Sequence, residues 1–433
     1  MEIRPTMSAP TSQIYTSAKS APTQAPVEKQ PEETFVASSN NGPVNLIITN
    51  SDKAKLEEMR ASILAQNPEN QVTAELPLVN GFAVTVNPSA DGTLLPNLAK
   101  ANEEGNRIFM DAQIGIPKNE MDDLENTFRP LMDTANVTLG VDKLHDQGIT
   151  GKGVTVCVID TGIAQHPDFE GRIVGFKDMV NGRTEPYDDQ GHGTHCTGIC
   201  AGSGKTSKGK YTGVAPEASI VGVKVLDRNG SGSLSNVIKG VQWAVENKDK
   251  LNIDVISMSL GGYVSQSYKD DPVVQAVEAA HAAGISCVVA AGNEGPSSGT
   301  IGSPGNAPHA ITVGALDDKG TVDRSDDDLA YFSSRGPSRI DKLEKPDILA
   351  PGVDITAASH KGKGYVTMSG TSMATPFAAG VDVLMHQVKP NISPDQVKEI
   401  MMKNADALEG VSKFEQGKGV IDPQENIEFL LGK

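Results

Sequence analysis

Three short segments of the chain each carry a side chain that can help a hydroxyl act as a nucleophile. The segments are Val158-Ile-Asp160-Thr-Gly162, Gly191-His192-Gly-Thr-His195 and Gly370-Thr-Ser372-Met-Ala-Thr-Pro376. Because a hydroxyl is a poor nucleophile at neutral pH, it needs a base that takes its proton and an acid that fixes the tautomer of that base. We therefore predict that Asp160, His192 and Ser372 form a Ser-His-Asp triad.

Each member of this set also has an ordinary structural interpretation. Asp160 can cap a turn, and Ser372 can be the N-cap of a helix. A histidine can be a buried structural residue whose ring nitrogens have hydrogen-bond partners. We assign that structural role to His166 and His195. A helix that starts at Ser372 would also serve the chemistry, since its free N–H groups and positive dipole end stabilise an oxyanion.

The surrounding sequence predicts the elements that hold these side chains. Short, nearly continuous apolar runs are typical of parallel strands whose two faces are both buried, and amphipathic stretches between them predict helices. The pattern predicts an α/β fold, a doubly wound and mostly parallel sheet flanked by helices, with its site at the carboxyl ends of the strands. The predicted strands are 154–159, 220–226, 255–260, 285–290 and 311–315, and the helices are 234–246, 272–283 and 372–388.

A smaller unit precedes this sheet. Strand-like runs at 44–48, 71–78, 82–86 and 107–116 alternate with helical patterns that begin near Asp52 and Leu95, and Asn80-Gly81 is a hairpin signal. The order β-α-β-β-α-β predicts a small α+β ferredoxin-like domain. We divide the chain into a disordered tail (1–42), this domain (43–117), an acidic connector (118–136) and a catalytic domain (137–433).

Composition excludes several classes of function. The net charge of −17 over 433 residues argues against nucleic acid and anionic membranes as partners. No run of ~20 apolar residues is present, and residues 1–41 lack the apolar core of a secretory signal. The four cysteines lie in apolar runs without paired Cys-x-x-Cys spacing, which favours free thiols over a metal site. We expect a cytoplasmic protein, or one exported by a route without an N-terminal signal peptide.

The order Asp160, His192, Ser372 with these flanking residues resembles the subtilisin-like serine proteases over about residues 141–432. The resemblance implies that Ser372 is the nucleophile, that His192 is the general base and then acid, and that Asp160 orients His192. Ala290-Ala-Gly-Asn293-Glu-Gly295 matches the oxyanion segment of the family, which implies that Asn293 donates a hydrogen bond to the tetrahedral intermediate.

The same resemblance extends to substrate binding. Ser259-Leu260-Gly261-Gly262 and Gly230-Ser231-Gly232 match the two segments that pair with an extended substrate backbone, and Gly302 matches the floor of the S1 pocket. It implies a serine endopeptidase that acts on polypeptides through an acyl-enzyme, with a preference for large apolar residues before the cleaved bond. The ferredoxin-like domain would be a propeptide, an intramolecular inhibitor removed by self-cleavage near residues 112–132.

Several residues depart from the secreted members of the family. The loop 201–213 carries three lysines and no acid or amide, so the calcium site common in this region is expected to be absent or rebuilt. We expect no cofactor or metal in the chemistry, and calcium only as a structural ion. Cys196 matches a thiol-bearing branch, which implies that mercurials inhibit by displacing His192. Asp382 replaces a small apolar residue and needs a partner if it is buried.

Two other functions were weighed against the protease. A catalytically silent subtilase that acts as a binding or scaffold protein would usually lack a triad member, yet Asp160, His192, Ser372 and Asn293 are all present. An esterase of the α/β-hydrolase type needs Gly-x-Ser-x-Gly and the order Ser, Asp, His. Here Thr371 precedes the serine and the order is reversed, so we disfavour both alternatives.

Overall fold

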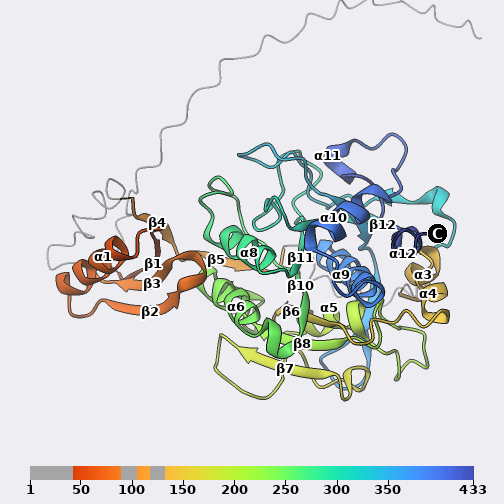
Figure 1. The fold of residues 1–433 in the computed structure, drawn as a ribbon, viewed down its shortest axis with the longest axis horizontal. Coiled ribbons are helices and arrows are strands. Elements are labelled where there is room, and N and C mark those ends of the chain that lie inside the picture. Colours follow the sequence, from red (N-terminus) through yellow and green to blue (C-terminus); the bar gives the residue numbers. More distant parts are fainter. Residues whose placement is uncertain (1–41, 89–104, 118–131) are drawn as a thin grey trace, which may run out of the picture. The chain divides into compact units, whose positions relative to one another are not determined.

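The central element is an eight-stranded, mostly parallel sheet (Figure 1). The computed structural model describes residues 42–88, 105–117 and 132–433. Seven strands follow the order β12-β11-β10-β6-β8-β7 with β14 beside β12, and only β13 runs antiparallel. The strands are β6 (Thr155–Asp160), β7 (Ile173–Asp178), β8 (Ser219–Lys224), β10 (Ile253–Met258), β11 (Ser286–Ala290), β12 (Ile311–Asp317), β13 (Asp328–Leu329) and β14 (Ile348–Pro351). The predicted fold class is confirmed.

Helices cover both faces of this sheet, as the apolar runs predicted. Alternate residues of β6 point to opposite faces: Val156 and Val158 join the core cluster of α5 (His192–Ala201) and α9 (Thr371–Val388), whereas Cys157 and Ile159 join that of α6 (Leu234–Glu246) and α8 (Pro272–Ala282). Figure 1 shows these two helix pairs on opposite sides of the strands. The other helices of the described catalytic region are α3 (Met132–Thr138), α4 (Val141–Asp146), α7 (Lys248–Leu251), α10 (Pro394–Lys403), α11 (Lys413–Gln416) and α12 (Pro423–Leu431).

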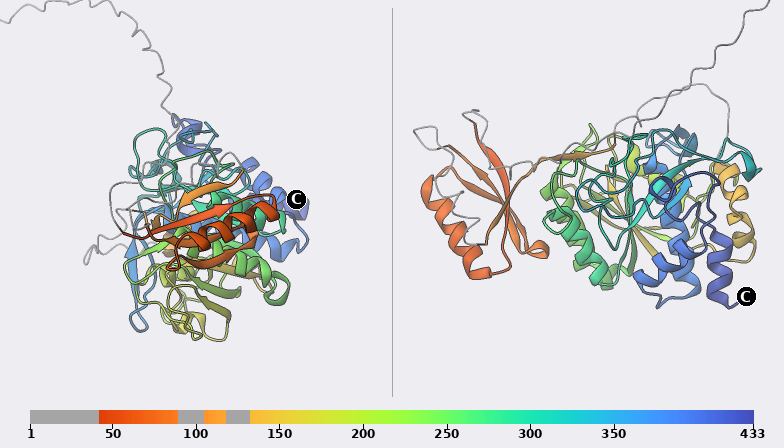
Figure 2. Two further views of the ribbon diagram at one scale, coloured as in Figure 1. Left: turned by 90° about the vertical axis from the view of Figure 1, so that its left-hand side faces the viewer. Right: turned by 90° about the horizontal axis from the view of Figure 1, so that it is seen from above.

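The N-terminal unit is an antiparallel sheet with the strand order β2-β3-β1-β4. One face packs on α1 through Leu46 and Ile48, and the other contributes Ile47 and Ala83 to the core cluster of α6 and α8. Figure 2 (right) shows the strands between α1 and the green helices. The elements are β1 (Val44–Thr49), α1 (Lys53–Gln66), β2 (Gln71–Leu76), β3 (Gly81–Val86) and β4 (Arg107–Met110). The helix predicted near Leu95 lies outside the described residues.

The N-terminal region differs from the prediction in two further respects. The single strand expected over 107–116 is divided into β4 and β5 (Gln113–Gly115), because β5 leaves the small sheet and pairs with β9 (Ser231–Ser233) of the larger domain. The predicted connector 118–136 ends in helix, since α3 begins at Met132. A hairpin of β15 (Ile355–Ala358) and β16 (Tyr365–Met368) completes the elements that surround the site.

Candidate active site

Asp160 and His192 meet at the carboxyl end of β6. His192 Nδ1 lies 2.8 Å from Oδ1 and 3.0 Å from Oδ2 of Asp160, and both residues are buried. Gly193 is required for this contact, because a Cβ there would lie 2.3 Å from the Gly162 carbonyl oxygen. The carboxylate therefore fixes the imidazole so that Nε2 is the nitrogen that can act as a base.

A second carboxylate, which sequence reasoning missed, holds the start of α5. Asp188 accepts hydrogen bonds from the backbone N–H of Gly191 at 2.8 Å and of Thr194 at 3.0 Å, and from the Thr194 hydroxyl at 2.7 Å. These bonds satisfy N–H groups that the first helical turn leaves without partners. The signal was present in the sequence, since an acidic residue just before a helix is an ordinary capping pattern.

Ser372 is the second residue of α9, and the N-cap is Gly370. The interpretation of Ser372 as an N-cap is therefore wrong. Pro376 lies four residues further on and has no N–H, so the Ser372 carbonyl cannot receive the usual helical hydrogen bond. It accepts instead from the Ser259 hydroxyl at 2.9 Å and from the Cys196 thiol at 3.4 Å. The proline thus leaves an acceptor that attaches Ser372 to α5 and to Ser259 of the segment 259–262, called the cleft strand from here on.

Cys196 connects His192 with Ser372. Its Sγ lies 3.8 Å from His192 Nδ1, in addition to its bond to the Ser372 carbonyl. Burial raises the pKa of the Cys196 thiol, so the sulfur stays protonated at neutral pH and packs beneath the imidazole. Since the thiolate is the reactive form of cysteine, the buried Cys196 thiol is a poor nucleophile at neutral pH.

Asn293 lies next to the start of α9. Its side-chain oxygen accepts from the backbone N–H of Thr371 at 3.0 Å and from the Thr371 hydroxyl at 2.9 Å. These two donors determine which end of the amide faces Thr371. The amide NH₂ group is therefore directed away from the Thr371 donors.

The two predicted substrate-binding segments face one another across a strand of the N-terminal unit. Gly115 exchanges both backbone hydrogen bonds with Gly261 (2.9 and 3.2 Å), and Ile116 donates to the Gly230 carbonyl at 3.0 Å. The other edge of the cleft strand pairs through Gly262 with Ser303, directly after Gly302. Residues 113–116 therefore make the main-chain contacts expected of an extended substrate.

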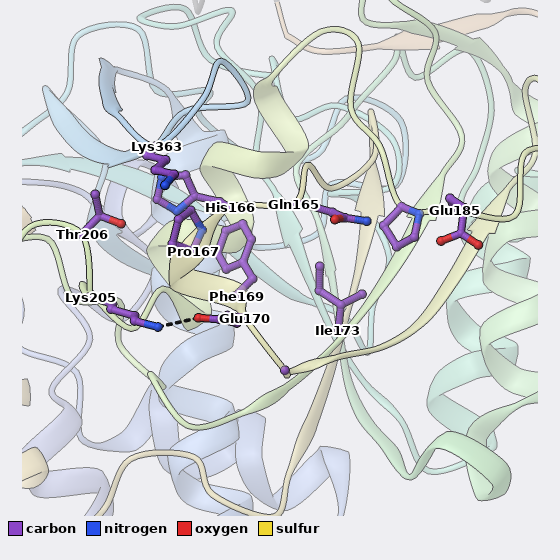
Figure 3. A pocket seen from close by; sticks show the side chains of 12 residues that line it. Gln165, His166, Pro167, Phe169, Glu170, Ile173, Glu185, Lys205, Thr206 and Lys363 are labelled. Carbon is purple, nitrogen blue, oxygen red and sulfur yellow. Dashed lines mark hydrogen bonds and ion pairs between the residues drawn. The ribbon is translucent and has the colours of Figure 1, made fainter.

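Protein donors already bind two groups of oxygens beside loop 201–213. Arg172 donates to the Ala201 carbonyl at 2.6 Å, and the Asp168 carboxylate accepts from Thr206 N–H at 3.0 Å and from the Tyr365 hydroxyl at 2.8 Å. In a nearby cavity of about 830 Å³, Lys205 pairs with Glu170 (Figure 3). None of the predicted catalytic or substrate-binding residues lines this cavity.

Acidic residues 317–328 are only partly solvated. Asp318 and the Asp327 side chain are buried, and Asp318 Oδ2 and Asp327 Oδ1 have no hydrogen-bond partner among the described residues. Burial, together with the charges of Asp327 and Asp317, raises the pKa of Asp318 to about 6. Two buried carboxylate oxygens are thus left for a proton or a cation.

Asp382 lies beside His386, one turn further along α9, but neither side chain has a hydrogen-bond partner among the described residues. His386 Nε2 lies 3.4 Å from Asp382 Oδ1, and both side chains are buried. Burial raises the pKa of Asp382 and lowers the pKa of His386 to about 4. The low-dielectric surroundings therefore favour the uncharged forms of both groups.

The chain belongs to the subtilase family, whose model matches residues 151–419. It is accordingly a subtilisin-like serine protease. It is 42% identical over 390 residues to Serine protease AprX of Bacillus subtilis (strain 168), an alignment that covers 86% of this chain and 84% of that relative. It is 40% identical over 285 residues to Subtilisin E of the same organism (65% and 67% covered). It is 37% identical over 279 residues to a thermostable alkaline protease of Halalkalibacterium halodurans (64% and 69% covered).

Among the described residues, none of the helices combines the length and the apolar character that crossing a membrane requires.

Proposed function

We propose that this protease is an endopeptidase that cleaves polypeptides through an acyl-enzyme formed on Ser372. His192 takes the proton of the Ser372 hydroxyl and returns it to the leaving amine, while Asp160 holds the imidazole and stabilises its charged form. Asn293 and the backbone N–H of Ser372 donate to the oxyanion of the tetrahedral intermediate.

The observation that carries this proposal is the pair of short contacts from His192 Nδ1 to both carboxylate oxygens of Asp160. The position of Cys196 supports Ser372 as the third residue of the triad, because the Cys196 sulfur contacts both the His192 ring and the Ser372 carbonyl. The Asn293 side-chain oxygen is occupied by Thr371, which supports an orientation with the amide NH₂ toward the reacting carbonyl.

We further propose that the protein is a zymogen in which residues 43–117 are the inhibitor. The pairing of residues 113–116 with Gly230 and Gly261 supports this role, because these are the contacts that a substrate backbone would make. Continuing the same antiparallel register brings Pro117 opposite Ser259. Self-cleavage within residues 112–132 would release the domain, and 137–433 would remain as the catalytic part.

One experiment tests both parts of the proposal. Wild type and Ser372→Ala are expressed as full-length chains, and band sizes and N-termini are followed over time. Wild type is expected to shrink by roughly the N-terminal domain, whereas Ser372→Ala stays full length, or copurifies with its propeptide if another protease nicks it. If the two chains process alike, self-cleavage by Ser372 is wrong.

The site of action and the ions are also part of the proposal. All four cysteines are free and buried, which supports a reducing compartment, the cytoplasm or one reached without a signal peptide. The mechanism uses no cofactor, nucleic acid or membrane. For a structural calcium ion, the partnerless oxygens of Asp318 and Asp327 are donors of the type that calcium takes.

A further inference from the structure

A carboxylate of the N-terminal domain is bound at the start of α6, beyond the strands of the cleft. Asp111 Oδ1 accepts from the backbone N–H of Ser235 at 2.9 Å, and Oδ2 accepts from the Ser235 hydroxyl at 2.6 Å. The next residue, Ala112, accepts from the backbone N–H of Leu234 at 3.1 Å. Two N–H groups of the first turn of α6 therefore bind this segment, one through a side chain and one through the backbone.

The start of α6 is suited to a negative charge for three independent reasons. The helix has 13 residues, and its positive dipole end points at the carboxylate. Ser235 offers two donors to one carboxylate, its backbone N–H and its hydroxyl. Lys239 follows Ser235 by four residues in α6, which places its positive charge on the same face of the helix.

The distance along the bound segment between Ser235 and the cleft strand is set by backbone pairing. Backbone hydrogen bonds run from Ile116 and Gly115 through β5 to Ala112, so the segment stays extended and paired along the enzyme. Any peptide that follows the same backbone path brings the side chain of its corresponding residue to Ser235. Residue 117 is opposite Ser259, so the residue whose side chain reaches Ser235, at position 111, precedes it by six positions.

We propose that, once residues 111–117 leave the cleft, Ser235 and Lys239 form a subsite that selects an acidic side chain six residues before the one opposite Ser259. The inference rests on the proposed function and extends it to the recognition of substrates. Because the contact lies far from the reacting bond and is present before reaction begins, it lowers KM and leaves kcat nearly unchanged.

The test compares two reporter peptides, Asp-Ala-Gln-Ile-Gly-Ile-Leu and the same peptide with Asn in place of Asp. A short peptide, Ile-Gly-Ile-Leu with the same reporter, measures activity without the subsite. The assay uses the protein that is recovered after the full-length chain has been expressed. The Asp peptide is expected to have about tenfold higher kcat/KM, as a charge-assisted hydrogen bond provides. The difference should lie in KM and shrink as salt is added.

Variants assign the effect to the subsite. Ser235→Ala and Lys239→Gln should each reduce the preference for Asp to about twofold and leave cleavage of the short peptide unchanged, while Lys250→Gln, a lysine of α7, should keep the full preference. Melting temperatures check that Ser235→Ala remains folded. Equal KM values for the Asp and Asn peptides in an enzyme that cleaves the short peptide would overturn the subsite.

Calorimetric binding of both peptides to the full-length Ser372→Ala chain separates this inference from the proposed function. The chain's own segment lowers both affinities by the same factor, so the ratio of the two affinities reports the subsite even without hydrolysis. A ratio near one overturns the subsite, and a ratio near ten supports it whatever the outcome of the processing experiment.

Discussion

A substitution at Gly115 should displace residues 113–116 from Gly230 and Gly261 without changing the proposed catalytic residues. A Cβ at this position would lie 2.6 Å from the Gly230 carbonyl oxygen, which is a backbone atom. That same oxygen accepts the hydrogen bond from Ile116 N–H. Gly115→Ala should therefore push the segment away from one wall of the cleft and break its pairing.

The expected size of the effect follows from the bonds that are lost. Gly115 and Gly261 exchange two backbone hydrogen bonds, and Ile116 makes a third to Gly230. With a net contribution of about 1 kcal/mol each, docking of the segment weakens by roughly 3 kcal/mol, which is about 10²-fold in the equilibrium. The fraction of molecules with an open cleft should rise by that factor until it saturates.

The assay is the time course of short-peptide cleavage by freshly diluted full-length protein. Wild type should start slowly and accelerate as its segment is removed, whereas Gly115→Ala should start fast with a much shorter lag. Gln113→Ala is the matched control, because this residue of the same strand has an exposed side chain. An unchanged lag and initial rate in Gly115→Ala, with an unchanged melting temperature, would refute the role of the segment as an inhibitor.

Four further predictions concern single residues. Pro117→Leu restores a backbone N–H opposite Ser259, so cleavage after residue 117 should become faster, as N-terminal sequencing of the products would show; unchanged products would contradict the register. Asn293→Ala should lower kcat by ~10²–10³ with little change in KM, and an unaffected acylation burst would remove it from the oxyanion site. Cys196→Ala should keep activity but lose inhibition by mercurials, since Cys196, His192 and Asp160 offer ligand atoms within 4.8 Å of one another; continued inhibition would place the sensitive thiol elsewhere. His195 has its pKa lowered to about 3 by burial, so the unfolded chain binds more protons between pH 3 and 6.5 and stability falls on acidification, by roughly 3 kcal/mol at pH 4.5. His195→Gln should flatten that dependence in denaturant titrations, and an unchanged slope would exclude His195 as its source.

Several elements near the site could be predicted because they are encoded locally, although α5, which carries His192, was not among them. The apolar runs gave the five central strands within about two residues, and α6 has the predicted bounds of 234–246. The proposed roles of Asp160, His192 and Ser372 also came from short local motifs. Local patterns suffice here because both faces of a parallel sheet are buried, so its strands differ sharply in composition from the segments between them.

Contacts between distant segments were the part that the sequence did not reveal. The strand expected over 107–116 is continuous in its residue pattern, yet Asp111 and Ala112 bind the start of α6 and divide it. Nothing in the local sequence of Pro376 indicates that it leaves the Ser372 carbonyl to Ser259 and Cys196. Such pairings depend on tertiary geometry, which propensity and periodicity do not describe.

An inhibitor within the same chain, as proposed for residues 43–117, must bind more tightly than a substrate and be cut more slowly. The contacts of Gly230 and Gly261 cannot make that distinction, because main-chain hydrogen bonds do not depend on the side chains of the bound segment. Asp111 and Pro117 can, and they act at opposite ends of the segment. Asp111 adds a charged contact that is complete before any bond changes, which strengthens binding without speeding the reaction. Pro117 removes the N–H that would pair with the cleft strand beside the nucleophile. Under the proposal, a substrate that keeps the acidic side chain matches the inhibitor at the start of α6 and differs from it at position 117, where it has a backbone N–H in place of proline.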